Sequence, residues 1–160
     1  IKIVRNKYPE IKFALMGQII NNRINAVSID EINEWKKNGL IEYLGFVKDV
    51  KYYLNKTECF VLPSYYNEGI AKSILEASAM SMPVITTNHK GCRDAVDNNV
   101  TGYLCDKNDP EDLACKMIKI LELSKIEKLN MGQKAREKMV KMFNEDIVIN
   151  KYLNELFVKN

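Results

Sequence analysis

Five short apolar runs, each separated from the next by a helical pattern, place the tightest constraint on how this chain folds. They are IKFALMG (11–17), IEYLG (41–45), CFVLP (59–63), PVITT (83–87) and TGYLC (101–105). Several runs are continuously apolar rather than alternating, which is typical of strands covered on both faces. Strands that alternate with helices predict an α/β fold with a doubly wound, parallel, Rossmann-like sheet.

Helix signals fill the intervals between these runs. Ser28 and Glu31 have the spacing of a capping box, and Gly39 is expected to close that helix. Pro110 stands where a helix over residues 110–122 would begin. The other helices predicted before residue 125 cover residues 1–8, 49–55, 69–81 and 92–97.

The pattern becomes purely helical after residue 125, and this change defines the predicted domain organisation. We assign residues 1–124 to a Rossmann-like domain and residues 125–160 to a C-terminal helical extension. Apolar residues recur at helical spacing near the end of the extension, namely Ile149, Tyr152, Leu153, Leu156 and Phe157. Such a stripe needs a covering surface. The extension is therefore expected to pack on the first domain or toward an N-terminal domain outside this chain.

The bulk properties argue against several classes of protein. A net charge of +3 is too small to indicate nucleic acid binding by itself. No apolar run approaches the length that spans a membrane. The four cysteines fit no zinc or redox spacing, and Cys59 and Cys105 lie in strand-like runs. Buried free thiols, and hence a reducing, cytoplasmic compartment, are the prediction.

Two glutamates eight positions apart, Glu68 and Glu76, follow the third apolar run. Ligands of doubly wound sheets bind outside the carboxyl ends of the strands, and the N–H groups at a helix start can bind an anion. Eight helical residues rise roughly 12 Å. That length suits a sugar at Glu68, a ribose at Glu76 and a diphosphate between them. Taken alone, the spacing favours a helix-dipole role for Glu68 and a surface role for Glu76.

The surrounding residues change that judgement, because they resemble the donor-binding half of the retaining glycosyltransferases called group 1. Members of this family have the GT-B architecture of two Rossmann-like domains. The ordered pattern of the family is present as Pro63-Ser64, Glu68, Glu76, Ala77, Pro83-Val84-Ile85, Gly91, Asp94 and Gly102. The segments YPEIKFALMG and IEYLGFVKDV also look like family segments. The resemblance covers most of residues 1–122.

The resemblance implies a role for each candidate residue. Glu68 would be the catalytic-site residue that contacts the donor sugar, and Glu76 would hold the ribose. Phe46 and Val47 would lie near the base, and Gly17 would let the backbone approach the nucleotide. Backbone N–H groups would face the sugar and the distal phosphate at Gly69, Ile70, Ala71 and Lys72. Lys72 departs from the apolar residue that is usual in the family.

The implied reaction moves a hexosyl or N-acetylhexosaminyl unit from a nucleotide sugar, UDP-linked by expectation, to an acceptor hydroxyl with retained configuration. No metal is expected. The resemblance suggests a bacterial enzyme of surface polysaccharide or glycolipid synthesis. A saccharide or lipid-linked acceptor would bind through the N-terminal domain outside this chain, so the chain alone is expected to be inactive.

Two further expectations follow from the resemblance and from the charge pattern. The first strand of the family's sheet would also lie outside this chain, which would either leave a gap or force two other strands together. The lysine-rich segment 116–141 allows peripheral contact with the inner face of the plasma membrane, although a solvated helix face is the simpler interpretation.

Other functions fit the sequence less well than a glycosyltransferase does. The main alternative is a non-catalytic Rossmann-like nucleotide-binding module. A dehydrogenase is disfavoured because no G-x-G-x-x-G follows a strand. A glycoside hydrolase is disfavoured because a separation of roughly 12 Å exceeds the usual span of about 5 to 10 Å between paired carboxylates. Tyr65 and Tyr66 could stack on a sugar or pack internally, and His89 is expected to be a surface or loop-packing residue.

Overall fold

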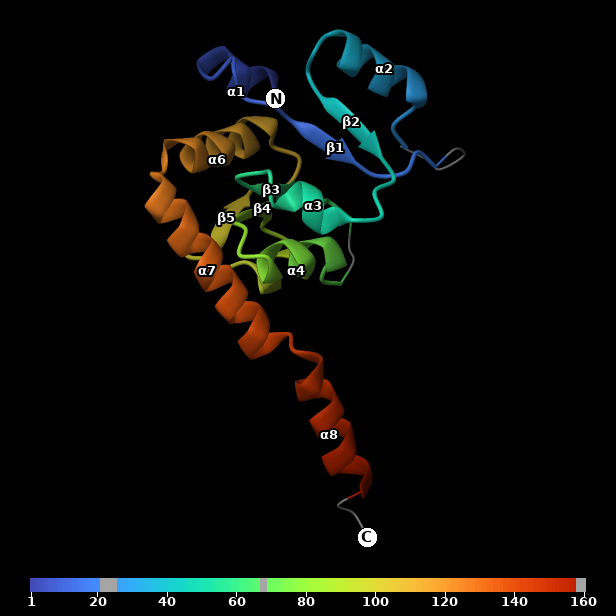
Figure 1. Cartoon of the computed structure of the whole chain (residues 1–160), viewed down its shortest axis with the longest axis vertical. Coiled ribbons are helices and arrows are strands. Elements are labelled where there is room, and N and C mark those ends of the chain that lie inside the picture. Colours follow the sequence, from blue (N-terminus) through green and yellow to red (C-terminus); the bar gives the residue numbers. More distant parts are fainter. Residues whose placement is uncertain (21–25, 67–68, 158–160) are drawn as a thin grey trace. The chain divides into compact units, whose positions relative to one another are not determined.

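The computed structural model describes residues 1–20, 26–66 and 69–157 of the chain. Helices and strands alternate along the sequence up to residue 122, and two more helices follow (Figure 1). Every strand pairing among the described residues is parallel. The chain divides into two compact units, residues 1–52 and 53–160. The parallel α/β architecture confirms the predicted fold class.

The first unit contains a two-stranded parallel sheet and the helices beside it. Its elements are α1 (Lys2–Lys7), β1 (Ala14–Met16), α2 (Ile29–Lys37) and β2 (Glu42–Gly45), and α3 (Val50–Leu54) crosses into the second unit. The predicted capping box opens α2: Ser28 Oγ accepts the Glu31 N–H at 3.2 Å, and Glu31 Oε2 accepts the Ser28 N–H at 2.9 Å. Gly39, with φ +64°, follows the end of α2.

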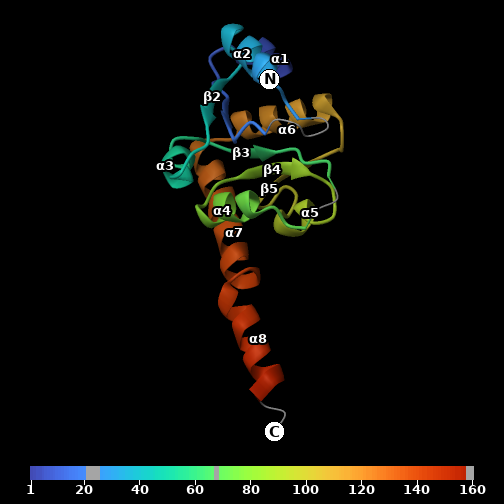
Figure 2. The ribbon, with the colours of Figure 1, turned by 90° about the vertical axis from the view of Figure 1, so that its right-hand side faces the viewer.

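The second unit is built on a three-stranded parallel sheet in the order β3-β4-β5. Its elements are β3 (Phe60–Leu62), α4 (Lys72–Ala79), β4 (Val84–Thr87), α5 (Cys92–Ala95), β5 (Gly102–Cys105), α6 (Pro110–Glu122), α7 (Lys125–Met142) and α8 (Glu145–Phe157). Figure 2 shows α6 on one side of this sheet and α4 with α5 on the other. All four residues of central β4 are buried, as its unbroken apolar run predicted.

All five predicted strands form, but they belong to two sheets. The sequence left open whether the sheet would have a gap or whether two strands would be forced together. In the described part of the chain β1 pairs only with β2, and β3 pairs only with β4. The described strands therefore form two sheets, one in each compact unit.

The core of the second unit lies where the sheet meets α6 and α7. Ile85 of β4, Tyr103 of β5, Ile120 of α6 and Met131 of α7 form one buried cluster. At its edge Gly102 lies so close to β4 that a Cβ there would be 1.9 Å from the Val84 carbonyl oxygen. A glycine is therefore needed for the two strands to meet at this point.

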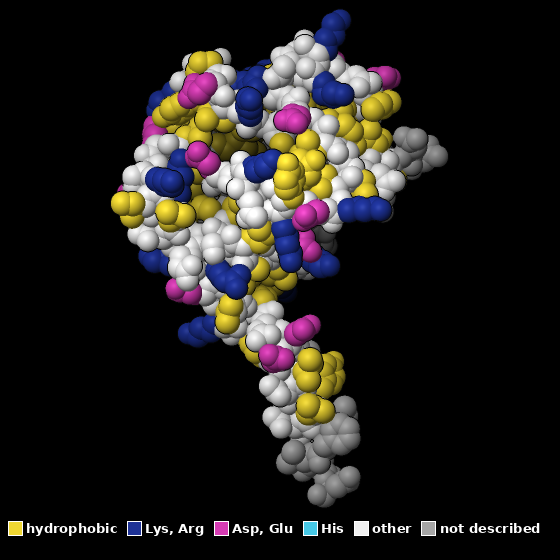
Figure 3. Space-filling view, viewed as in Figure 1, with side chains coloured by type: hydrophobic (Ala, Val, Ile, Leu, Met, Phe, Trp, Pro, Cys, Tyr) yellow, Lys and Arg dark blue, Asp and Glu magenta, His cyan; other side chains and the backbone are white. Residues whose placement is uncertain are grey.

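Helix α7 is fastened to the rest of the second unit by polar contacts along its length. Lys138 Nζ lies 2.7 Å from Asp97 Oδ1, and Lys128 pairs with Glu58. The Arg136 guanidinium donates to the Ala79 carbonyl at the end of α4. Gly132 lets α7 pass close to the turn at Ser81. Apolar side chains of α8 stay exposed, however (Figure 3), among them Ile147, Ile149, Tyr152 and Leu153.

Candidate functional site

The loop that follows β3 is held in place by two buried threonines of β4. Thr86 Oγ1 donates to the Leu62 carbonyl at 2.8 Å, and Thr87 Oγ1 donates to the Ser64 carbonyl. Both threonines are at most 1% exposed, so these hydrogen bonds compensate the burial of their hydroxyls. The chain therefore leaves the sheet at a fixed point, Ser64, and the predicted binding residues follow.

Helix α4 begins later than the sequence predicted. Its first residue is Lys72 and its N-cap is Ala71, so Gly69 and Ile70 precede the helix, and the helix ends at Ala79 rather than at residue 81. The prediction of a helix over residues 69–81 was wrong at both ends. The N-cap is an alanine, whose side chain cannot accept a hydrogen bond, and no described side chain caps this end. The first N–H groups of α4 thus have no partner within the helix.

Gly69 lies in the open just before this helix. It is exposed, and a Cβ built on it would have no atom within 4 Å. A ligand could therefore approach the backbone between Gly69 and Ala71 without meeting a side chain at Gly69. Glu68 lies outside the described residues. The helical separation of roughly 12 Å between Glu68 and Glu76 does not hold, because residues 69–71 are not helical.

Glu76 lies on α4 and forms an ion pair with Lys72 one turn earlier. Lys72 Nζ is 3.5 Å from Glu76 Oε1, and the two side chains are 88% and 45% exposed. A pair this exposed contributes at most about 1 kcal/mol to stability. Either side chain can therefore leave the ion pair and bind a ligand at a small cost in free energy. The i, i+4 spacing of Lys72 and Glu76 is the sequence signal that could have indicated this pair.

The first unit brings its three predicted nucleotide-binding residues to one end of its sheet. The Gly17 N–H donates to the Gly45 carbonyl at 2.9 Å, which joins the chain segments that leave β1 and β2. Tyr43 Oη donates to the Gly17 carbonyl at 2.8 Å, a contact that the sequence did not suggest. Phe46 follows Gly45 and is 70% exposed, and Val47 is half-buried. The predicted nucleotide-binding residues of the first unit thus lie together at the carboxyl end of its own sheet.

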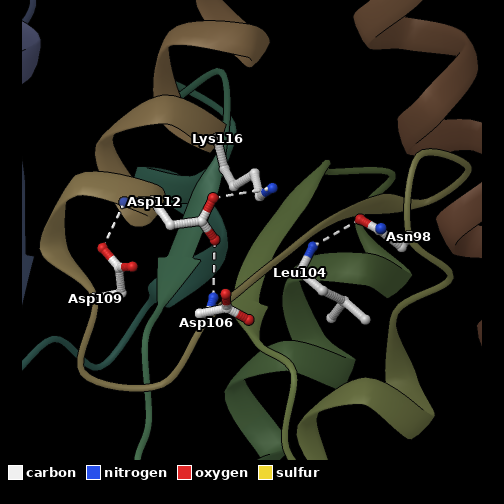
Figure 4. Close-up of polar contacts among 6 residues, drawn as sticks. All are labelled: Asn98, Leu104, Asp106, Asp109, Asp112 and Lys116. Atoms are coloured by element: carbon white, nitrogen blue, oxygen red, sulfur yellow. Dashed lines mark hydrogen bonds and ion pairs between the residues drawn. The ribbon is translucent and has the colours of Figure 1, made fainter.

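The loop after β5 is closed by a network of acidic residues (Figure 4). Asp112 Oδ2 accepts the Asp106 N–H at 2.8 Å, Asp109 Oδ1 accepts the Asp112 N–H at 2.8 Å, and Lys116 Nζ lies 3.1 Å from Asp112 Oδ1. Burial by itself would raise the pKa of Asp112, but the Asp106 N–H and Lys116 together lower it. The Asp109 carboxylate caps the start of α6, and the Asp112 carboxylate closes the loop before it, so this cluster has a structural role.

The described residues contain no group of three or more His, Cys, Asp or Glu side chains that could hold a metal ion. In the same part of the chain, no helix combines the length and the apolarity that crossing a bilayer requires.

The cysteines should differ sharply in reactivity. Burial raises the pKa of the Cys59 thiol to about 12 and that of Cys105 to about 11, and Cys92 is buried, whereas Cys115 is exposed. Because the thiolate is the nucleophile, iodoacetamide at pH 8 is expected to label Cys115 alone in the folded protein. Mass spectrometry of the labelled peptides checks this, with the denatured chain as the control. Labelling of Cys59 at the rate of Cys115 would contradict the structure.

The sequence matches one protein family over most of its length. The family described as "Glycosyl transferases group 1" matches residues 1–138. The chain is 32% identical over 120 residues to the N,N'-diacetylbacillosaminyl-diphospho-undecaprenol alpha-1,3-N-acetylgalactosaminyltransferase of Campylobacter jejuni, covering 75% of the chain and 31% of that relative. It is 26% identical over 147 residues to the capsular polysaccharide biosynthesis glycosyltransferase CapM of Staphylococcus aureus, covering 92% of the chain and 38% of that relative.

Solved structures show the same fold. Staphylococcus aureus TarM aligns with a TM-score of 0.80 and 26% identity, over 96% of this chain and 30% of that one. The C-terminal domain of the group 1 protein LpcC from Francisella tularensis aligns with a TM-score of 0.72 and 19% identity, over 88% of this chain and 74% of that one. Anabaena HepE in complex with UDP aligns with a TM-score of 0.79 and 19% identity, over 99% of this chain and 45% of that one.

Proposed function

Because this chain belongs to the group 1 glycosyltransferases, we propose that it is the nucleotide-sugar-binding half of a retaining enzyme of GT-B architecture. The chain spans about a third of the length of the curated relatives it matches. The activity therefore belongs to the whole protein: transfer of a hexosyl or N-acetylhexosaminyl unit from a UDP-linked donor to an acceptor hydroxyl. The proposed setting is bacterial surface polysaccharide or glycolipid synthesis in the cytoplasm, with the acceptor bound by the N-terminal domain.

The observation that carries this proposal is the open N-terminal end of α4 beside the exposed carboxylate of Glu76. The uncapped N–H groups near Lys72 and the positive end of the helix dipole favour a diphosphate there. Glu76 lies one turn further along α4, where its carboxylate can accept hydrogen bonds from the two ribose hydroxyls. Glu68 keeps its proposed role at the donor sugar, which rests on the family pattern alone.

Lys72 gains a side-chain role in this arrangement. When Glu76 turns to the ribose, the Lys72 ammonium is released beside the place proposed for the diphosphate. It then offsets part of the negative charge that develops on the leaving nucleotide diphosphate. No metal is required in this scheme, because the helix end and cationic side chains supply the stabilising charge.

The other unit would hold the base. The joined bends at Gly17 and Gly45 present the ring of Phe46 to solvent. An exposed aromatic ring can stack on a uracil. A Cβ built on Gly17 would have no atom within 4 Å, so the space beside this glycine is open. The alternative function, a nucleotide-binding module without turnover, uses the same residues. Under this alternative the whole protein would bind the nucleotide but would not transfer a sugar.

The test replaces Glu76 and measures nucleotide affinity. Calorimetric titration with UDP is expected to give about tenfold weaker binding for Glu76→Gln, because a charge-assisted hydrogen bond contributes about 1.5 to 3 kcal/mol. A UDP analogue that lacks both ribose hydroxyls should bind the variant and the parent equally. Glu137→Gln is the matched control, since Glu137 is also an exposed glutamate with a partner four residues earlier. Unchanged UDP affinity in Glu76→Gln would refute the ribose role.

A further inference from the structure

Tyr65 and Tyr66 lie side by side on the surface at the carboxyl end of β3. Their ring centroids are 4.3 Å apart with 29° between the planes, and Tyr65 Oη donates to Tyr66 Oη at 2.9 Å. Tyr65 is 38% exposed and Tyr66 is 53% exposed. The pair is therefore a surface feature, and the sequence-based alternative of internal packing is ruled out for Tyr66 in particular.

We propose that this pair is an aromatic platform that binds a pyranose ring beside the sugar-transfer site. A pyranose has an apolar C–H face and a rim of hydroxyls, and a tyrosine offers the matching combination of an apolar ring and a polar tip. The stacking and the mutual hydrogen bond hold the rings before any ligand arrives. Little side-chain freedom is then lost on binding.

The position of the pair supports a sugar as the ligand. Ser64, anchored by Thr87, precedes the tyrosines directly. Three Cα–Cα steps separate Tyr66 from Gly69, which limits that separation to about 11 Å. A sugar held in the open space at Gly69 is thus within reach of the two rings. The base has its own aromatic candidate, Phe46, in the other unit, so a nucleobase is not the expected occupant here.

The hydroxyl of Tyr65 is consistent with this role, because its hydrogen bond to Tyr66 raises the pKa of Tyr65. A neutral ring with a hydroxyl can stack on a sugar and also hydrogen-bond to its rim. The platform rests on the proposed function, since it adds a contact to the same site, and the ring could belong to the donor or to a saccharide acceptor.

The experiment uses two kinds of ligand, uridine nucleotides with and without a sugar and a free glycoside, to separate these two sources. Calorimetry compares UDP with UDP-glucose and UDP-N-acetylglucosamine, and saturation-transfer NMR follows methyl β-glucoside as a free pyranose. If the ring is the donor's, Tyr66→Ala weakens UDP-sugar binding about threefold to tenfold and leaves UDP unchanged. If it is the acceptor's, Tyr66→Ala loses the saturation transfer to methyl β-glucoside instead. Tyr66→Phe, which keeps the ring, should retain most of either effect.

Several controls keep the outcome decisive. Tyr152→Ala removes a tyrosine that is 62% exposed on α8 and should change neither probe, and thermal unfolding confirms that each variant is folded. The platform is overturned if Tyr66→Ala binds the UDP-sugars and methyl β-glucoside as well as the parent does. It is also overturned if the parent shows no effect of the sugar on UDP-sugar affinity and no saturation transfer to methyl β-glucoside. If UDP binding still depends on Glu76 in that case, the proposed function survives. If the parent binds no UDP, the proposed function fails. The platform is then tested only by whether Tyr66→Ala loses the saturation transfer to methyl β-glucoside.

Discussion

Gly102→Ala is expected to lower the free energy of unfolding of the second unit by about 3 kcal/mol or more. Gly102 begins β5 opposite Val84 of β4. A Cβ at this position would lie 1.9 Å from the Val84 carbonyl oxygen and 3.0 Å from the Val84 nitrogen. Because these are backbone atoms of the central strand, no side-chain rotation can relieve the overlap. Strand β5 must shift away from β4, and their parallel pairing weakens.

Urea denaturation followed by circular dichroism measures this effect. Gly69→Ala is the matched control, because a Cβ at Gly69 meets no atom within 4 Å, and its stability should stay within about 0.5 kcal/mol of the parent. The account of the sheet fails if Gly102→Ala unfolds at the same urea concentration as Gly69→Ala.

The second large effect is expected at Gly132, which lies within α7. Exchanging a glycine for alanine inside a helix usually stabilises it by about 1 kcal/mol. Here the sign should be reversed, because a Cβ would lie 1.9 Å from the Ser81 carbonyl oxygen and 2.7 Å from the Ser81 carbonyl carbon. Ser81 is held in a left-handed conformation, with φ +59°, in the turn between α4 and β4. A destabilisation of about 2 to 4 kcal/mol is expected.

Asn130→Ala provides the control in the same helix, since Asn130 is exposed and alanine favours a helix. In thermal unfolding, the melting temperature of Asn130→Ala should equal or exceed that of the parent, and that of Gly132→Ala should be well below it. A gain in stability for Gly132→Ala would show that α7 does not pack against the Ser81 turn. That packing matters for the site, because α7 also binds the carboxyl end of α4 through Arg136.

The sequence predicted elements best where a local signal defined their ends. Helix α6 covers the predicted residues 110–122, because Asp109 caps it and Pro110 occupies its first turn. The capping box at Ser28 opens α2 as expected. Helix α4 has an alanine as its N-cap, so no residue type marked its start, and the prediction placed that start three residues early. The division of the strands into two sheets depends on contacts distant in sequence, which local patterns do not encode.

The candidate site shows a similar limit. The order of motif residues was enough to identify the family, which the comparisons confirm. The roles of Gly17, Phe46, Val47, Gly69, Ile70, Ala71, Lys72 and Glu76 stay predictions, as does that of Glu68. The sequence could not show that Thr87 fixes Ser64 or that Tyr43 holds Gly17, because each hydrogen bond joins residues more than twenty positions apart. It also could not decide between an exposed and an internal tyrosine pair.

The central claim is that a nucleotide sugar binds at the start of α4 with its nucleotide reaching Glu76. Amide chemical-shift mapping of the ¹⁵N-labelled chain during titration with UDP-glucose tests it most directly. The account predicts the largest shifts at Gly69 to Ser73 and at Glu76, with a second group at Gly17 and Phe46 and none along α8. Saturable shifts confined to other elements, or an unperturbed Lys72 amide at full occupancy, would contradict it.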